Sequence, residues 1–161
     1  MRPTPDRVRE TLFNWLGQTL DGKSCLDLFA GSGALGFEAA SRGAASVVMV
    51  ESERDVHEAL AGNAHLLDAD NIEMRCADAF AFLASDRRLF DVIFLDPPFQ
   101  LDLLPRLLGM LGRHLAPGGL VYVEAGTVPD VPAGCVIRRR SQAGQVNFLL
   151  LEFTDYDGAI Q

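Results

Sequence analysis

The sequence predicts an α/β fold with a single, mostly parallel sheet of seven strands, helices on both faces and a C-terminal antiparallel hairpin. Short apolar runs alternate with segments of helical periodicity along most of the chain. A glycine-rich stretch joins the first apolar run to the helix that follows it. The last two apolar runs are separated only by a short turn around Ala143 and Gly144, as in a hairpin.

The first expected helix begins near Thr4, which is placed as the N-cap, with Pro5 at the first helical position and Asp6 in the first turn. Strands are expected at residues 24–30, 45–51, 72–77, 90–96, 119–124, 135–141 and 145–154. Helices between them are expected at residues 34–42, 53–68, 79–85 and 101–115. The Pro-Gly-Gly sequence at 117–119 is expected to end the last of these helices.

The length of 161 residues predicts one domain that spans residues 1–161, with the helical segment 1–18 packing on it. Hydrophobic residues make up 48% and charged residues 22%, which is ordinary for a soluble protein. No apolar run has the length of a membrane span and the first residues do not resemble a signal peptide, so we expect a cytoplasmic protein. The net charge of −8 argues against a nonspecific binder of polyanions.

Cysteine and histidine spacing gives no sign of a metal site. The sequence has no CxxC pair, and its histidines have no metal-ligand spacing with one another or with the cysteines. Cys25, Cys76 and Cys135 are interpreted as small buried residues in a reducing compartment. We therefore expect no metal.

The most informative stretch lies at residues 90–99, where a buried apolar strand ends in Asp96, Pro97, Pro98 and Phe99. Two consecutive prolines cannot continue a central strand, because neither has an N–H to donate. The chain must therefore leave the sheet at Asp96, at the carboxyl end of the strand, where ligands bind in open α/β sheets. A carboxylate, backbone carbonyls and a ring at one turn can hold a planar amine. The other interpretation of Phe99 is a core aromatic after a turn.

The first strand runs into a G-x-G-x-x-G sequence that contains Gly31, Ser32 and Gly33 and opens a helix. Such a loop binds nucleotide cofactors of several kinds, because glycine lets the backbone approach a ligand closely. Glu51 ends the second strand, where an acid can bind ribose hydroxyls. A dinucleotide and other adenosine cofactors satisfy these two features equally well.

Asp27 favours one cofactor, because a carboxylate in a buried strand is costly unless it is paired. It would repel a pyrophosphate and attract an ammonium group, and S-adenosylmethionine combines an adenosine with such a group. The alternative is that Asp27 caps a neighbouring loop. Asp78 ends the third strand and could accept from the adenine amino group, or cap the helix at 79–85; the two roles are compatible.

The chain resembles class I S-adenosylmethionine-dependent amino-methyltransferases in the sequence LDLFAGSG at 26–33 followed by DPPF at 96–99. The stretches RPT, DRVRE and LFNWL near the N-terminus narrow the resemblance to the bacterial RsmD family, which methylates the exocyclic N2 of one guanine in 16S ribosomal RNA. The resemblance covers nearly the whole chain and implies a Rossmann-like fold. Family members usually carry a further basic, glycine-rich segment before RPT that is implicated in RNA contact; this sequence begins at the motif.

The resemblance implies roles for particular residues. Those expected to bind S-adenosylmethionine and its product S-adenosylhomocysteine are Asp27, Phe29, Gly31, Ser32, Gly33, Glu51, Asp78 and Ala79. Those expected to act on the amine are Asp96, Pro97 and Phe99, with Phe99 stacking on the base. Substrate contacts are expected from Pro98, Arg2, Thr4 and Arg7. From its charge alone, the basic triplet at 138–140 is either a solvated face or a phosphate contact. The expected partner is 16S ribosomal RNA in a 30S particle or assembly intermediate, bound by a monomer.

Three other functions remain open at this point. One keeps the cofactor and changes the acceptor to a DNA base amine or a protein glutamine; the glutamine enzymes more often have Asn at the position of Asp96. Another is a nicotinamide-binding or regulatory Rossmann domain without chemistry of its own, which leaves Asp27 and the turn at 96–99 unexplained. The last is a ribosome-assembly factor that binds RNA without turnover.

Overall fold

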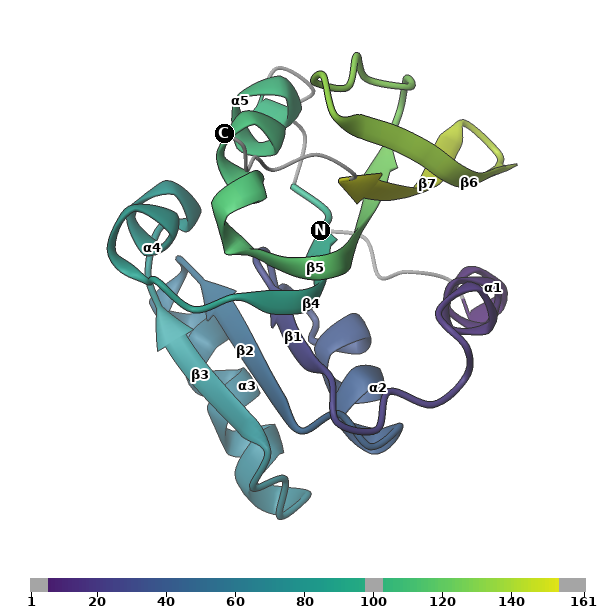
Figure 1. Cartoon of the computed structure of the whole chain (residues 1–161). Coiled ribbons are helices and arrows are strands. Elements are labelled where there is room, and N and C mark those ends of the chain that lie inside the picture. The colour runs from purple at the N-terminus through teal and green to yellow at the C-terminus, as the bar shows by residue number, and fades with distance from the viewer. Residues whose placement is uncertain (1–5, 98–102, 154–161) are drawn as a thin grey trace.

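The structure, a computed structural model, describes residues 6–97 and 103–153. These residues form a seven-stranded sheet in the order β3-β2-β1-β4-β5-β7-β6 (Figure 1). The strands are β1 (Ser24–Asp27), β2 (Ser46–Glu51), β3 (Ile72–Cys76), β4 (Phe90–Leu95), β5 (Leu115–Ala125), β6 (Cys135–Ala143) and β7 (Val146–Phe153). Strands β1 to β5 pair in parallel, whereas β7 runs antiparallel to β5 and to β6. The predicted mostly parallel sheet with a C-terminal hairpin is confirmed.

Helices cover both faces of the sheet, as predicted (Figure 1). They are α1 (Asp6–Trp15), α2 (Ala34–Ser41), α3 (Arg54–Leu66), α4 (Ala79–Ser85) and α5 (Leu103–Leu111), with a 3₁₀ turn at Gly112–His114. Successive strand residues point to opposite faces. Leu26 and Ile93 therefore pack under α4 and α5, while Cys25 and Phe94 pack under α1, α2 and α3. No helix in the described part of the chain is long and apolar enough to cross a membrane.

Three buried aromatic rings, here named the aromatic row, connect α1 to the centre of the sheet. The ring of Phe13 in α1 lies 6.0 Å from that of Phe94 in β4, centroid to centroid. Phe94 in turn meets Tyr122 of β5 edge to face at 6.5 Å. Such tilted and edge-to-face contacts add to the stabilisation from burial. The helix that carries the LFNWL sequence is thus packed against the two strands that end at the cavity described below.

Several expected boundaries are wrong. The helix expected at 101–115 ends at Leu111, and β5 begins at Leu115 rather than at 119. Residue Leu115 pairs with Phe90 and Leu120 pairs with Val92, so the Pro-Gly-Gly sequence forms a bulge in β5 instead of ending a helix. Proline is tolerated at such a bulge because no ladder hydrogen bond is required there. Strand β1 ends at Asp27, and residues 28–30 begin the following loop.

The order of the strands determines where a ligand can bind. Strand β1 is flanked by β2 on one side and by β4 on the other, and the connections from β1 and from β4 proceed in opposite directions across the sheet. Ligands in open α/β sheets bind at the carboxyl ends of the strands beside such a reversal. Asp27 and Leu95, the last residues of β1 and β4, lie at this edge.

Glycine is required at position 33 for two reasons, which a pair of variants can separate. Gly33 has φ +86°, and a Cβ there would lie 2.5 Å from the Phe37 ring and 2.7 Å from the Leu60 side chain. Gly17 has φ +101° with no such neighbour. Gly17→Ala should lower the free energy of unfolding by about 1 kcal/mol through backbone strain. Gly33→Ala should lower it by about 1–3 kcal/mol more through overpacking. Urea unfolding measures both, and equal losses would contradict the packing role of Gly33.

Candidate functional site

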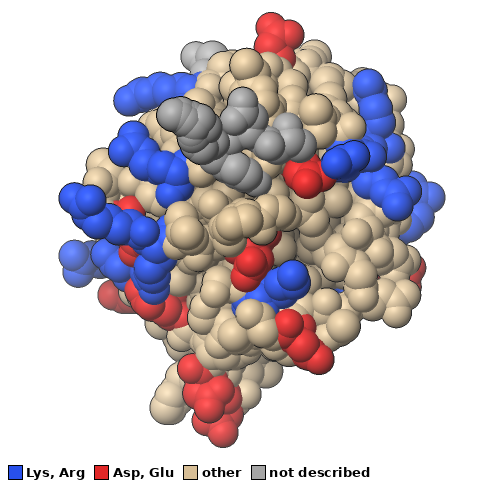
Figure 2. Space-filling view, in the orientation of Figure 1, with Lys and Arg blue, Asp and Glu red and all other residues tan. Residues whose placement is uncertain are grey.

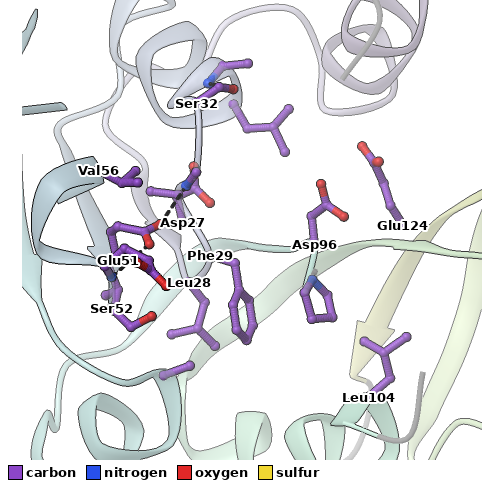
Figure 3. A pocket seen from close by; sticks show the side chains of 18 of the residues that line it. Asp27, Leu28, Phe29, Ser32, Glu51, Ser52, Val56, Asp96, Leu104 and Glu124 are labelled. Carbon is purple, nitrogen blue, oxygen red and sulfur yellow. Dashed lines mark hydrogen bonds between the residues drawn. The ribbon is translucent and has the colours of Figure 1, made fainter. Parts of the chain in front are cut away.

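A cavity of about 1010 Å³ opens at the carboxyl ends of β1, β2, β3, β4 and β5 (Figure 3). Its walls come from the loop after each of these strands, from α2 and α3, and from the turn between β6 and β7. The lining residues from the first half of the chain are Asp27–Ser32, Ala34, Leu35, Val50–Glu53, Val56 and Ala77–Ala79. The second half contributes Asp96, Pro97, Leu104, Glu124–Gly126, Gln145 and Val146.

Glu51 holds the glycine-rich loop in place. It is the last residue of β2 and is 8% exposed. Its Oε1 accepts the backbone N–H of Gly31 at 2.9 Å, and its Oε2 accepts that of Glu53 at 3.0 Å. Hydrogen bonds to a carboxylate are stronger than those between neutral groups. These two bonds hold the glycine-rich loop, of which Phe29, Gly31 and Ser32 line the cavity.

Asp27 ends β1 and is buried at the base of the same loop. Its Oδ2 accepts the backbone N–H of Gly36 in the first turns of α2, at 3.1 Å. Burial raises the pKa of Asp27 to about 7, the Gly36 hydrogen bond opposes this rise, and the negative charge of Glu51 adds to it. Asp27 therefore does hold the loop-helix junction, which was the alternative reading, and it also lines the cavity.

Asp78 lies at the end of β3 and caps α4, since its Oδ2 accepts the backbone N–H of Ala81 at 3.1 Å. It lines the cavity together with Ala79, the first residue of α4. The capping role is the expected local one. Its position at the cavity wall is compatible with the other expected role, which is to accept a hydrogen bond from the adenine amino group.

Asp96 and Pro97 follow β4 and line the cavity on the side away from β2 and β3. Pro97 is buried and Asp96 is half-buried. In Figure 3 the Asp96 side chain projects from the strand end into the space between the glycine-rich loop and Glu124. The strand does end at Leu95, as the two prolines predict.

Two of the expected site residues that the structure describes do not line the cavity. Gly33 does not line the cavity; it is the N-cap of α2 and packs against Phe37 and Leu60. Arg7 is exposed on α1 and does not line the cavity. Cys76, expected to be buried, is exposed at the end of edge strand β3. Outside the described residues are Arg2, Thr4, Pro98 and Phe99.

Sequence reasoning assigned no role to Glu124, although it lines the cavity beside Asp96. It lies near the end of β5, and its Oε2 accepts a hydrogen bond from the hydroxyl of buried Tyr122 at 2.7 Å. An acid at the end of an apolar strand is the same signal that identified Glu51 and Asp96. The cavity wall at Gln145 and Val146 had no signal in the sequence, because it depends on the packing of the hairpin.

Negative charge dominates the lining of the cavity. Six of its lining residues are acidic, namely Asp27, Glu51, Glu53, Asp78, Asp96 and Glu124, and no Lys or Arg is among the described residues that line it. Figure 2 shows acidic side chains near the centre of this face and most Lys and Arg side chains toward its two sides. Such a cavity favours a positively charged ligand and disfavours a pyrophosphate. Within the described residues, no group of three or more His, Cys, Asp and Glu could hold a metal ion.

The ionisation of Asp27 should make stability depend on pH. Its folded pKa of about 7 exceeds the ordinary 3.8, so the folded protein binds this proton more tightly than the unfolded chain. This stabilisation is complete below about pH 4 and is lost as the pH rises to about 7. Between pH 5 and pH 8, the free energy of unfolding of the ligand-free wild type should fall by about 2–3 kcal/mol more than that of Asp27→Asn. The amide oxygen of the substituted side chain in this variant can still accept the hydrogen bond from Gly36. Urea unfolding at both pH values measures this difference, and identical losses would contradict it.

Comparison with known proteins places the chain in a family. The family described as Conserved hypothetical protein 95 matches residues 1–152. The chain is 43% identical over 157 residues to ribosomal RNA small subunit methyltransferase D of Escherichia coli K12, covering 94% of this chain and 79% of that protein. The solved structure of yhhF from Escherichia coli is 41% identical, with a TM-score of 0.88 over 95% of this chain and 88% of that one.

A more distant structure shows the same fold with a ligand. An RNA methyltransferase from Salinibacter ruber, solved in complex with S-adenosyl-L-homocysteine, is 22% identical. Its TM-score is 0.77, over 98% of this chain and 97% of that one. With the family match and the closer relatives, this likeness establishes a class I methyltransferase fold. The chain therefore belongs to the RsmD family of methyltransferases.

Proposed function

We propose that the protein transfers a methyl group from S-adenosylmethionine to the exocyclic N2 amine of a guanine in 16S ribosomal RNA. One observation carries the proposal: a single cavity contains both the glycine-rich loop, held by Glu51, and the strand end with Asp96 and Pro97. The first part suits an adenosine cofactor and the second a planar amine. Donor and acceptor can thus meet in one space. The relative in Escherichia coli that is named a ribosomal RNA methyltransferase supports the choice of RNA.

The acidic lining fits S-adenosylmethionine better than a dinucleotide. When bound, this cofactor supplies a methyl group on a positively charged sulfur. Asp27 and Glu51 lie where the ammonium and the ribose hydroxyls of such a ligand are expected, at the ends of β1 and β2. Asp78 and Ala79 line the cavity beyond them, after β3, where they would bind the adenine. The glycine-rich loop, with Phe29 and Ser32, covers the methionine part.

Asp96 and Pro97 orient the amine that receives the methyl group. The Asp96 carboxylate and the Pro97 carbonyl each accept one N–H of the amine. The nitrogen is thereby drawn toward tetrahedral geometry, and its lone pair points at the glycine-rich loop side of the cavity. Positioning and charge stabilisation of this kind account for large rate enhancements without prior removal of a proton. After transfer the extra proton leaves the nitrogen to Asp96 or to water.

The RNA approaches over the open face of the cavity. The target guanine must be turned out of its stack to reach Asp96. Basic side chains lie at the two sides of the face in Figure 2, where they could contact phosphates. The exposed triplet at 138–140 on β6 is proposed as a further phosphate contact. The proposal keeps Phe99 as the stacking partner of the base, with Pro98, Arg2, Thr4 and Arg7 as further substrate contacts. The protein acts as a monomeric single domain in the cytoplasm on 30S particles or their precursors.

The proposal is tested by methyl transfer from labelled S-adenosylmethionine to 30S particles and to naked 16S ribosomal RNA, with mass spectrometry of the product nucleosides. The wild type should yield N2-methylguanosine. Asp96→Ala should lower kcat by about 100-fold or more, because a group that stabilises the developing charge is removed. Its affinity for S-adenosylhomocysteine, measured by calorimetry, should stay close to that of the wild type.

Asp130→Ala provides the matched control, since Asp130 is exposed and does not line the cavity. It should retain the activity of the wild type. Full activity of Asp96→Ala, or a methylated product other than N2-methylguanosine, would overturn the proposed function.

A further inference from the structure

Glu124 and Asp96 form a pair of carboxylates at the ends of neighbouring parallel strands. In the register of β4 and β5, Leu95 lies opposite Val123, so Asp96 and Glu124 occupy the next positions of the two strands. Neighbouring strands are about 4.8 Å apart, which is close enough for two adjacent groups of one ligand to meet both carboxylates. Figure 3 shows both side chains projecting into the cavity.

Tyr122 orients the Glu124 carboxylate. The two residues lie on the same face of β5, and the Tyr122 hydroxyl donates to Glu124 Oε2 at 2.7 Å. Burial, together with the charge of Glu124, raises the pKa of Tyr122 far above its ordinary range, so the hydroxyl stays a donor. Tyr122 is itself fixed in the aromatic row by its contact with Phe94. A carboxylate can accept about four hydrogen bonds, so this contact is compatible with a further one from a ligand.

Two adjacent acceptors match a ligand with two adjacent donors. On the edge of guanine the 2-amino group lies beside N1–H, and both are donors. In adenine and cytosine the amino group lies beside a ring nitrogen with a lone pair, and in a glutamine amide it lies beside a carbonyl oxygen. A carboxylate that faces such a lone pair is repelled by it, which disfavours these amines in a partly buried site.

We infer that Glu124 accepts a hydrogen bond from N1–H of the target guanine and thereby selects guanine over bases with a lone pair beside the amino group. The inference rests on the proposed function and assigns the choice of base to Glu124. Asp96 holds the reacting amine, Glu124 reads the neighbouring ring position, and Tyr122 acts as a positioning residue for Glu124. The same contact draws electron density toward the amine as positive charge develops on it.

The test replaces the target guanine by 2-aminopurine, which keeps the 2-amino group but has a lone pair at N1. After the wild type has located the modified guanine in 16S ribosomal RNA, RNAs with guanine or 2-aminopurine at that site are compared by kcat/KM. The wild type should prefer guanine by about 100-fold or more, as sites built to bind a hydrogen-bond donor do. Glu124→Gln can donate its amide N–H to the lone pair, so this preference should narrow by at least about 10-fold.

Two further variants distinguish a change in base recognition from a general loss of structure or activity. Tyr122→Phe removes the orienting hydrogen bond. Its preference for guanine over 2-aminopurine should be smaller than that of the wild type and larger than that of Glu124→Gln. Glu58→Gln makes the same change on an exposed residue of α3 outside the cavity and should leave the preference unchanged. Thermal unfolding and calorimetric binding of S-adenosylhomocysteine show that each variant is folded.

The outcomes distinguish this inference from the proposed function. A wild type that forms no N2-methylguanosine overturns both. A wild type that forms it, while Glu124→Gln keeps the full preference for guanine over 2-aminopurine, overturns the role of Glu124 alone. Narrowing of the preference in Glu124→Gln and not in Glu58→Gln is the expected result.

Discussion

The hydrogen bonds that two buried carboxylates accept from backbone N–H groups are the interactions on which the cavity depends. Glu51 binds the N–H of Gly31, and Asp27 binds that of Gly36, so both ends of the turn from β1 into α2 are fixed by acids. Removal of either acid would leave a buried donor unpaired as well as loosening the loop. The same charges stand close together, which costs stability in the empty protein. A cationic ligand would relieve that cost, so the groups that shape the cavity also favour positive charge in it.

Much of the fold follows from local sequence, and the exceptions have a common physical cause. Unbroken apolar runs identify buried parallel strands, and the two prolines after Asp96 identify the end of β4. The predicted start of β5 was wrong because a Pro-Gly-Gly sequence is locally typical of the end of a helix. Its true conformation is decided by pairing between β5 and β4, where Leu115 and Leu120 find partners and the residues between them bulge outward. Such long-range pairing leaves no mark in the local pattern.

The site was predictable to the extent that single residues carry their own signal. Glu51 and Asp96 stand out because each ends an apolar run, and Asp27 stands out because it lies inside one. All three line the cavity. Gly33 belongs to the G-x-G-x-x-G sequence, but it packs against Phe37 instead of lining the cavity. Glu124 carries the same signal as the other acids, yet its importance comes from its neighbour Asp96. That neighbourhood depends on the order of strands in the sheet, which the sequence alone does not specify.

The hairpin of β6 and β7 has a consequence for how the protein is made. Its turn supplies Gln145 and Val146 to the cavity wall, while the glycine-rich loop and the acids at the ends of β1 and β2 come from the first third of the chain. Translation proceeds from the N-terminus at about 5–20 residues per second, and early segments can fold first. A nascent chain that has emerged only as far as β5 exposes the clustered carboxylates without their opposite wall. The complete cavity wall therefore forms only once β7 has inserted between β5 and β6.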